Sequence, residues 1–274
     1  MAEATTACGS PGPIEELPRR SNCCASCRGS GSPPCSETPV LRVNPVCPIG
    51  QRVVIGAALA NIPVVLNERD RGNVAAPSVC YRGHCVDGAD AGLMYLARRA
   101  ASDAALDTLF AADSDDDDDA SGEASFAEAP LVPATAALVT HARAVLDIAN
   151  RLATLQLAAA SAAPADAKAT KRDAAVAFEA LERALRDGPA PAGPFVAGAK
   201  PSFADAAVLP LVARQMCLTM GACMDAAPRL WALYEAACTA SEAVADSIEE
   251  HGFDMDAFED YAQAWADECA VCTA

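Results

Sequence analysis

Basic and aromatic residues are scarce in this chain of 274 residues. Lys and Arg number 20 against 37 Asp and Glu, the net charge is −17, and aromatic residues make up 5% of the chain. Nucleic acids and anionic membranes are bound through clustered Lys and Arg, so this composition argues against both as partners. Alanine accounts for much of the 52% hydrophobic content, which favours closely packed helices over a sheet sandwich.

Neither a signal peptide nor a stable membrane span is predicted. The N-terminus carries Glu3 and a Gly/Pro-rich stretch where a signal peptide needs an apolar core. The longest strongly apolar run, Val53–Leu66, is interrupted by Asn61 and Pro63 and is shorter than the ~20 residues that span a bilayer. We therefore expect a cytoplasmic protein whose thirteen cysteines are reduced, an odd number that excludes complete pairing within one chain.

Composition and periodicity divide the chain into four segments. We expect a disordered Cys/Gly/Pro-rich tail at 1–38, a small α/β domain at 39–101, an acidic linker at 102–130 and an all-helical domain at 131–272. In the tail, Cys24, Cys27 and Cys35 could supply thiolates to zinc or copper(I). No second C-x2-C pair and no histidine accompany them in the tail, so we predict exposed free thiols and no metal site. The acidic residues of the tail argue against a cleaved transit segment.

The α/β domain is predicted to run strand, helix, strand, hairpin, helix. The expected elements are strands at Val40–Val43 and Pro63–Asn67, a helix at Gln51–Ala60, a hairpin at Pro77–Asp87 and a helix at Gly88–Ala101. In the hairpin, Cys80 and Cys85 face each other across the two strands. A reversible disulfide is one reading, but we expect two reduced thiols that fill half-buried positions.

Cys47 lies where the first strand ends and the first helix begins. Pro48 suits the first helical position, because its missing N–H would have had no partner there. The unpaired amides and the positive end of that helix would favour a thiolate over a thiol at Cys47. Cys47 is therefore a candidate nucleophile, and a buried, inert thiol in a strand–loop–helix corner is the alternative.

The second half of the chain carries helical signals throughout. One stripe of a long helix is formed by Leu138, Ala142, Val145, Ala149 and Leu152. A second helix is expected at Lys171–Asp187, and a further one begins at Pro228. Ser202 and Asp205 directly precede an apolar run and predict a reciprocal helix cap, which is a structural role and not a catalytic one.

Three stretches together resemble the glutathione transferase superfamily. Cys47-Pro-Ile-Gly-Gln-Arg52 is similar to the Cys-Pro-x-x-Gln-Arg active-site motif of its cysteine-type branches: omega, dehydroascorbate reductase and chloride intracellular channel. Asp90–Leu96 resembles the start of the third helix of the N-terminal domain, and Gly193–Pro210 with Pro228–Tyr234 resembles the buried capping segment and the next helix. The resemblance covers about residues 39–250. It implies an α+β thioredoxin-like N-terminal domain followed by an all-α C-terminal domain.

The resemblance also implies roles for the matched residues. Cys47 would form a mixed disulfide with glutathione as co-substrate. Pro77 would be a cis-proline, and the backbone of Ala76 would pair with the cysteine of glutathione. Asp90 begins the helix whose amides would receive the γ-glutamyl carboxylate, beside Ala89. The second substrate would be a small electrophilic or disulfide compound, and a homodimer is left open.

Three departures from the family pattern bear on this glutathione site. Ala89 replaces the serine usual before Asp90 and removes a hydroxyl from the expected carboxylate site. Only Glu68–Ala76 separate the second strand from Pro77, which leaves little room for the usual second helix. Gly50 stands where a second cysteine would complete a redox pair, so disulfide exchange would be monothiol.

The leading hypothesis is a glutathione-dependent thiol transferase or dehydroascorbate reductase-like enzyme that uses Cys47. A catalytically degenerate binding module for protein–protein contacts is the main alternative, favoured by Ala89, by the short second connection and by the acidic segments. A membrane-inserting protein like the chloride intracellular channel branch is a weaker third, because the apolar run Val53–Leu66 is interrupted.

Overall fold

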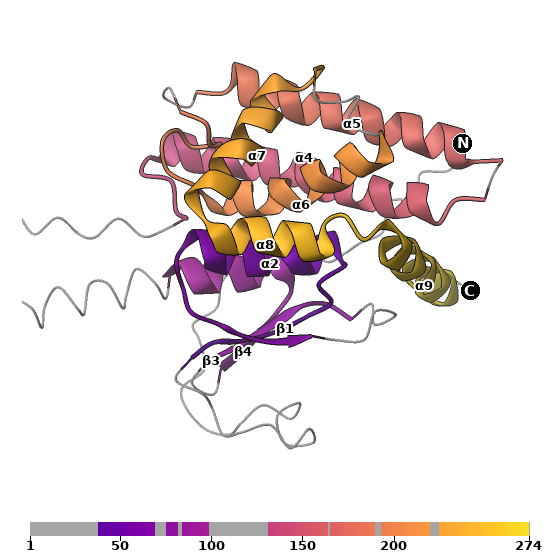
Figure 1. Ribbon diagram of the computed structural model, residues 1–274, viewed down its shortest axis with the longest axis horizontal. Coiled ribbons are helices and arrows are strands. Elements are labelled where there is room, and N and C mark those ends of the chain that lie inside the picture. The colour runs from indigo at the N-terminus through magenta and orange to yellow at the C-terminus, as the bar shows by residue number, and fades with distance from the viewer. Residues whose placement is uncertain are drawn as a thin grey trace, which may run out of the picture.

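The computed structural model describes residues 38–68, 75–81, 84–98, 131–163, 165–189, 193–219 and 225–273. Within these ranges a small sheet lies at one side of a larger body of helices (Figure 1). The expected tail, Thr38 apart, and the acidic linker 102–130 lie outside the described residues. So do residues 69–74, most of the segment Glu68–Ala76 that was expected to leave little room for the usual second helix.

The sheet has four strands in the order β2-β1-β3-β4 among the described residues. Strand β1 (Val40–Val43) pairs parallel with β2 (Val65–Glu68) and antiparallel with β3 (Ser78–Tyr81), which pairs antiparallel with β4 (His84–Asp87). The prediction of β1 is confirmed. The second strand begins two residues later than expected, because Val65 lies opposite the first residue of β1.

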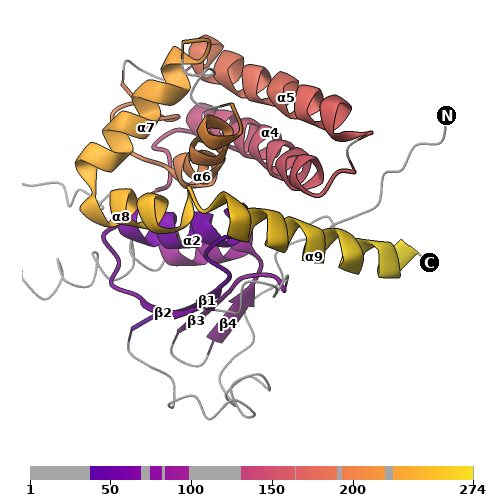
Figure 2. The ribbon, with the colours of Figure 1, turned by 45° about the vertical axis from the view of Figure 1, so that its right-hand side comes forward.

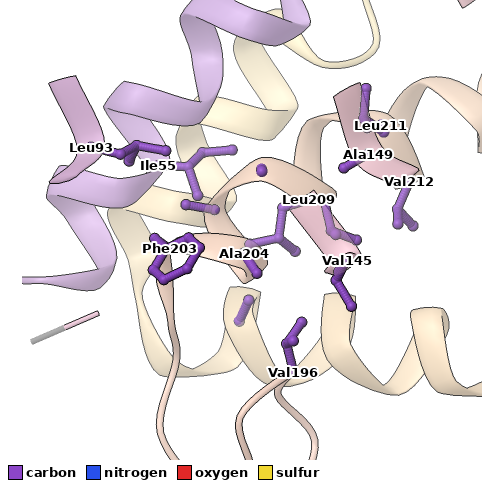
Figure 3. Packing of buried hydrophobic residues seen from close by; sticks show 14 of the residues in the cluster. Ile55, Leu93, Val145, Ala149, Val196, Phe203, Ala204, Leu209, Leu211 and Val212 are labelled. Carbon is purple, nitrogen blue, oxygen red and sulfur yellow. The ribbon is translucent and has the colours of Figure 1, made fainter. Parts of the chain in front are cut away.

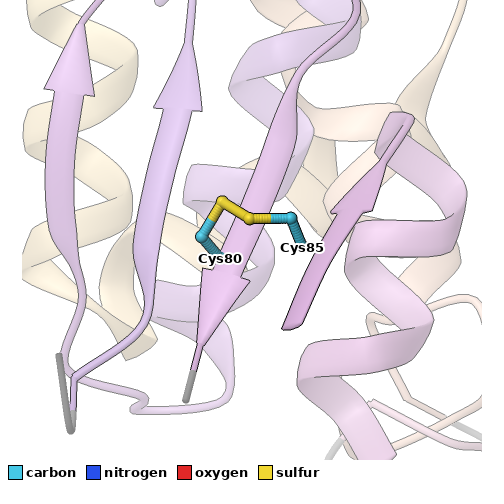
Figure 4. The surroundings of a disulfide bond; sticks show 2 residues. All are labelled: Cys80 and Cys85. Carbon is cyan, nitrogen blue, oxygen red and sulfur yellow. A yellow bond between two sulfur atoms is a disulfide. The ribbon is translucent and has the colours of Figure 1, made fainter. Parts of the chain in front are cut away.

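The β3–β4 hairpin contains a disulfide (Figure 4). Cys80 and Cys85 are directly opposite each other in the strand register, and their Cα atoms are 4.1 Å apart. Residues opposite each other point to the same face of a sheet, so the two side chains meet without backbone movement. The prediction of two reduced thiols at this position is therefore wrong.

Helix α2 (Pro48–Leu59) and the helical residues 89–98 pack against the sheet. Gly56 allows α2 to approach its neighbours closely. A Cβ at this position would lie 2.1 Å from Leu93 Cδ2 and 3.5 Å from the Cβ of Ala206 in α6. Gly56 therefore makes room for Leu93 beside α2, the helix that also packs against α6 of the helical domain.

The helical domain consists of α4 (Ala136–Ala160), α5 (Ala167–Asp187), α6 (Phe203–Leu218), α7 (Pro228–Ala240), α8 (Glu242–His251) and α9 (Met255–Thr273). Helix α6 is buried continuously from Phe203 to Gln215. Figure 3 shows its side chains between those of α2 and α4. The stripe predicted on α4 is confirmed from Ala142 to Leu152, where its residues are fully buried.

The architecture is the predicted one: a thioredoxin-like sheet domain followed by an all-helical domain. A single core of buried side chains runs through both, from Leu41 and Val79 in the sheet to Val145 and Leu209 in the helices. Across the described part of the chain, every helix is too short or too polar to span a bilayer.

Candidate active site

Cys47 occupies the N-cap of α2, and Pro48 takes the first helical position, as predicted. A turn at Asn44 delivers the cysteine to this place. The Asn44 carbonyl accepts from the Cys47 N–H at 3.2 Å, and its Oδ1 accepts from the Val46 N–H at 3.1 Å. The Cys47 side chain makes no capping hydrogen bond, and the first turn of α2 holds no acidic residue. The positive end of this helix therefore has no anion supplied by its own first turn.

Gly50 explains why no second cysteine follows Cys47. A Cβ at position 50 would lie 2.6 Å from the backbone oxygen of Asn44, a distance that real Cβ atoms do not reach. The turn that positions Cys47 thus occupies the space in which a resolving thiol would stand. This contact accounts for the monothiol pattern by packing.

Cys47 is only 5% exposed. It belongs to a small apolar cluster separate from the main core, in which the end of α4 and one face of α9 close over the cysteine. Its buried members are Val46, Cys47, Leu157, Ala257, Phe258, Tyr261 and Ala262. Figure 2 shows α9 continuing beyond α8 past α2, with its C-terminal end projecting from the molecule. The cysteine is therefore placed as a nucleophile would be, but α9 covers it.

Tyr261 of α9 is the polar member of this cover. Its side chain hydrogen-bonds the side chain of Cys47, and burial, then the neighbouring Cys47, raises the pKa of the phenol. Sequence reasoning missed this residue. The signal available was the spacing of Phe258, Tyr261 and Trp265, which puts three aromatic side chains on one face of an acidic helix.

Arg214 of α6 is completely buried and bonds the residue directly before Cys47. Its Nη1 donates to Gln51 Oε1 at 2.8 Å and to the Pro210 carbonyl at 3.0 Å, and its Nη2 donates to the Val46 carbonyl. Burial lowers the pKa of Arg214 to about 10, and the nearby Cys47 opposes that shift. The sequence motif includes Gln51 but gave no reason to connect it with Arg214.

Arg52 and Asp90 form a second buried network near α2. Arg52 Nη1 bonds Asp90 Oδ1 at 3.0 Å and Asn150 Oδ1 at 2.5 Å, while Asn150 Nδ2 donates to Asp90 Oδ2 at 3.2 Å. The network ties the helical residues 89–98 to α2 and α4. Burial lowers the pKa of Arg52, which the Asp90 charge opposes. The carboxylate of Asp90 is thus engaged within the protein, although it remains 44% exposed.

The expected glutathione-binding residues lie at the entry to β3 and at the next helix. Ala76 is exposed and Pro77 is buried just before β3, while Ala89 is buried at the start of the helical residues 89–98. The expectation of a cis bond at Pro77 is wrong, since no described peptide bond is cis. Trans is the lower-energy form of an X-Pro bond by roughly 0.5–1 kcal/mol. In this form the Pro77 carbonyl accepts from the Gly88 N–H at 2.8 Å and extends the hairpin.

Ser202 and Asp205 form the predicted helix cap at the start of α6. Asp205 Oδ2 accepts from the Ser202 N–H and hydroxyl, each at 2.7 Å, and Oδ1 accepts from the Val196 N–H at 2.8 Å. Burial raises the pKa of Asp205 to about 6, and these hydrogen bonds oppose the rise. Both residues serve the fold, in agreement with the sequence reading.

Metal ligation finds no support in the part of the chain that the structure describes, where no three His, Cys, Asp or Glu side chains gather into a cluster. Cys24, Cys27 and Cys35 of the tail lie outside that part.

Comparison with known proteins bears on the fold. No protein-family model and no curated protein matches the chain. A trimeric glutathione transferase of Leishmania, TDR1, matches with a TM-score of 0.58 and 17% identity over 81% of this chain and 49% of its own, so this chain spans about half the length of that protein. A rice glutathione transferase, OsGSTU1, solved in complex with glutathione, matches with a TM-score of 0.57 and 21% identity over 85% of this chain and 98% of its own.

An omega-class structure is also similar. Glutathione transferase Omega 3C from Trametes versicolor matches with a TM-score of 0.57 and 16% identity over 86% of this chain and 94% of its own. The matching structures thus come from several classes of one superfamily, and at these identities they establish the arrangement of the chain in space. The protein has the fold of the glutathione transferases.

Proposed function

We propose that this protein is a glutathione-dependent thiol transferase in which Cys47 is the nucleophile. The observation that carries the proposal is the position of Cys47 at the N-cap of α2, directly before Pro48 and beside the buried guanidinium of Arg214. Helix amides and a nearby cation both favour a thiolate, and the thiolate is the reactive form of a cysteine.

The reaction proceeds in two exchanges. The Cys47 thiolate attacks the glutathione sulfur of a mixed disulfide, the substrate sulfur leaves as a thiolate, and Cys47 carries glutathione in a new disulfide. A glutathione thiolate then attacks that glutathione sulfur, which releases oxidised glutathione and restores the Cys47 thiolate. Each exchange breaks one S–S bond and forms another. Because the Asn44 turn excludes a second thiol at Gly50, glutathione itself resolves the intermediate.

Glutathione is proposed to lie along the entry to β3. Ala76, just before Pro77, is an exposed residue at this point and is the proposed backbone partner for the cysteine of glutathione. The first amides of the helical residues 89–98 would receive the γ-glutamyl carboxylate beside Ala89. Asp90 contributes through Arg52 and Asn150, which hold this helix against α2 and α4.

Several features of the proposal remain predictions. The second substrate is a small disulfide or electrophile, with dehydroascorbate reduction as the finer possibility. The cytoplasm is the proposed compartment and a homodimer the proposed assembly. Access to Cys47 requires α9 to shift, because Phe258 and Tyr261 of this helix pack over the cysteine.

The test is the exchange reaction itself, measured with glutathione and a small mixed disulfide on the full chain. Cys47→Ser should abolish turnover, whereas Cys238→Ser, at a half-buried free thiol in α7, should leave it unchanged. Brief treatment with substoichiometric oxidised glutathione, followed by peptide mapping, should place glutathione on Cys47 first. Unchanged turnover in Cys47→Ser would reject the proposal.

A catalytically degenerate binding module is the second candidate. Two observations favour it: Cys47 is only 5% exposed, and the Asp90 carboxylate is already bonded within the protein. This candidate predicts that oxidised glutathione modifies Cys217 and Cys238 before Cys47. It also predicts that Cys47→Ser behaves as the wild type in every binding assay.

A further inference from the structure

Arg214 is a buried cation whose charge is not balanced by a carboxylate in the described part of the chain. Its guanidinium is fully buried in the middle of α6, and among the described residues no carboxylate pairs with it. A charge buried in a low-dielectric interior costs several kcal/mol unless an opposite charge or a full set of hydrogen bonds compensates it. Here the hydrogen bonds are incomplete, because the buried Nε has no partner.

Apart from its bond to the Pro210 carbonyl in its own helix, the contacts of Arg214 hold it against the surroundings of Cys47. Its Nη2 bonds the carbonyl of Val46, the residue directly before the cysteine. Its Nη1 bonds Gln51, in the first turns of the helix that Cys47 caps, and Gln51 in turn donates to the Ser247 carbonyl at 2.9 Å. The guanidinium carbon lies 5.1 Å from the ring centre of Phe258, which belongs to the cover over Cys47.

Among the described residues, few groups near Arg214 can carry the balancing negative charge. The acidic groups of this part of the chain that act on it are Cys47, Cys217 and Tyr261. Burial raises the pKa of Cys217 and raises that of Tyr261 further, so both stay neutral at neutral pH. Cys47 is left as the group whose ionised form can compensate the buried cation, at the helix end where a thiolate is also favoured.

We propose that Arg214 is a positioning residue whose buried charge is the counter-ion of a Cys47 thiolate. Each charge then lowers the free-energy cost of burying the other. The inference rests on the proposed use of Cys47 as a nucleophile, and it names the residue that prepares the nucleophile. The other titratable groups that face this pair are Arg52 on α2 and Glu268 on α9, the latter through Tyr261.

The ultraviolet absorbance of the thiolate tests the proposal without glutathione and without access for a reagent. The signal of Cys47 is the difference between each protein and the same protein with Cys47→Ser, recorded against pH. Arg214→Met removes the charge and keeps an apolar stem, while Arg214→Lys keeps the charge. We expect Arg214→Met to raise the pH at which the Cys47 signal appears by about 1 to 3 units, and Arg214→Lys to raise it by less.

Tyr261→Phe provides a matched control, because it removes one hydrogen bond to Cys47 and leaves the buried charge in place. Its effect should be smaller than that of Arg214→Met. An Arg214→Met protein that folds and shows the Cys47 signal at the wild-type pH overturns the proposal. A merely structural arginine would lower the free energy of unfolding and leave that pH unchanged.

A second measurement decides the question if Arg214→Met does not fold. A folded state that holds a thiolate binds fewer protons than the unfolded state, so its stability rises with pH. The stability advantage of the wild type over Cys47→Ser should therefore grow between about pH 5 and about pH 8. An advantage that stays constant over this range overturns the proposal. Loss of exchange activity alongside an intact thiolate signal would instead count against the proposed function alone.

Discussion

Helices α6 and α2 both begin in the interior, and their N-termini are built in opposite ways. At the start of α6, Asp205 is a buried carboxylate that accepts three hydrogen bonds and supplies the negative charge the helix end favours. At the start of α2, the N-cap is Cys47, no acidic residue occupies the first turn, and the buried cation Arg214 bonds the carbonyl of the preceding residue, Val46.

On the proposed function, the difference separates a helix end that supports the fold from one that is prepared for chemistry. The α6 end carries the carboxyl group of Asp205, whose partners are backbone amides and the hydroxyl of Ser202. At the α2 end, the positive potential of the helix terminus is balanced in our proposal by the thiolate of Cys47. This thiolate can react and is restored at the end of the reaction. Burial shifts the pKa of Asp205 at one helix end and that of Arg214 at the other, so burial alone does not distinguish the two roles. The arrangement of the groups around each helix end does.

The largest expected effect of a substitution is on the α6 side. Asp205→Ala should lower the free energy of unfolding by about 3 to 5 kcal/mol, because it leaves the Val196 N–H and the Ser202 N–H and hydroxyl buried without acceptors. Cys47→Ala, the matched change at the other helix end, should cost about 1 kcal/mol. Urea unfolding of the two variants measures both. Equal losses would contradict the contrast between a structural end and a chemical one.

The second effect is the pH dependence of the same carboxylate. Burial raises the pKa of Asp205 from 3.8 to about 6, so the folded state binds the proton more tightly than the unfolded state does. Stability from this group is therefore fully present below about pH 4 and is lost as the pH rises through about 6.

Asp205→Asn removes that titration and provides the reference. Relative to this variant, the wild type should lose about 3 kcal/mol of unfolding free energy between about pH 3 and about pH 7, measured by urea unfolding at each pH. The comparison cancels the titration of the other acidic residues. A wild type that gains stability on the variant over this range would show that hydrogen bonding outweighs burial at Asp205.

The contrast also shows what the sequence could and could not predict. Ser202 and Asp205 were identified as a helix cap because the capping box is a local pattern, four residues long, with one physical explanation. Pro48 after Cys47 was equally local. Arg214 and Tyr261 reach Cys47 from helices far along the chain, and only the packing of α6 and α9 brings them there.

The errors have a similar origin. Pro77 was expected to be cis because of a family resemblance, although nothing in its local sequence distinguishes the two isomers. The position of Cys80 opposite Cys85 in the hairpin was predicted correctly. Both were expected to be reduced because of the assumed compartment, whereas their register allows the disulfide that the structure contains. Local patterns determined the elements, whereas redox state and isomer depended on context that the sequence does not carry.

The third prediction concerns the Asn44 turn that presents Cys47. Gly50→Ala adds a Cβ that would meet the backbone oxygen of Asn44 at 2.6 Å, and a backbone atom cannot move aside as a side chain can. Alanine is the better helix former by about 1 kcal/mol, yet the clash should outweigh this and lower stability by about 1 to 2 kcal/mol. Thermal unfolding checks the sign. A gain in stability would mean that the turn is free to shift and that a second thiol could have been accommodated.

The last prediction converts one helix end into the other. Cys47→Asp places a carboxylate at the N-cap of α2, where aspartate is among the preferred residues, and beside the cation of Arg214. Cys47→Asn is the matched uncharged variant and caps about as well. Any difference in stability between the two therefore reports the charge.

At neutral pH we expect Cys47→Asp to exceed Cys47→Asn in unfolding free energy by about 1 kcal/mol, and both to be inactive in thiol exchange. The difference should disappear when Arg214→Met is added to both, because the carboxylate then has no buried cation to balance. If the asparagine variant were the more stable of the two, the α2 end could not hold a negative charge, and the thiolate proposed there would lose its electrostatic basis.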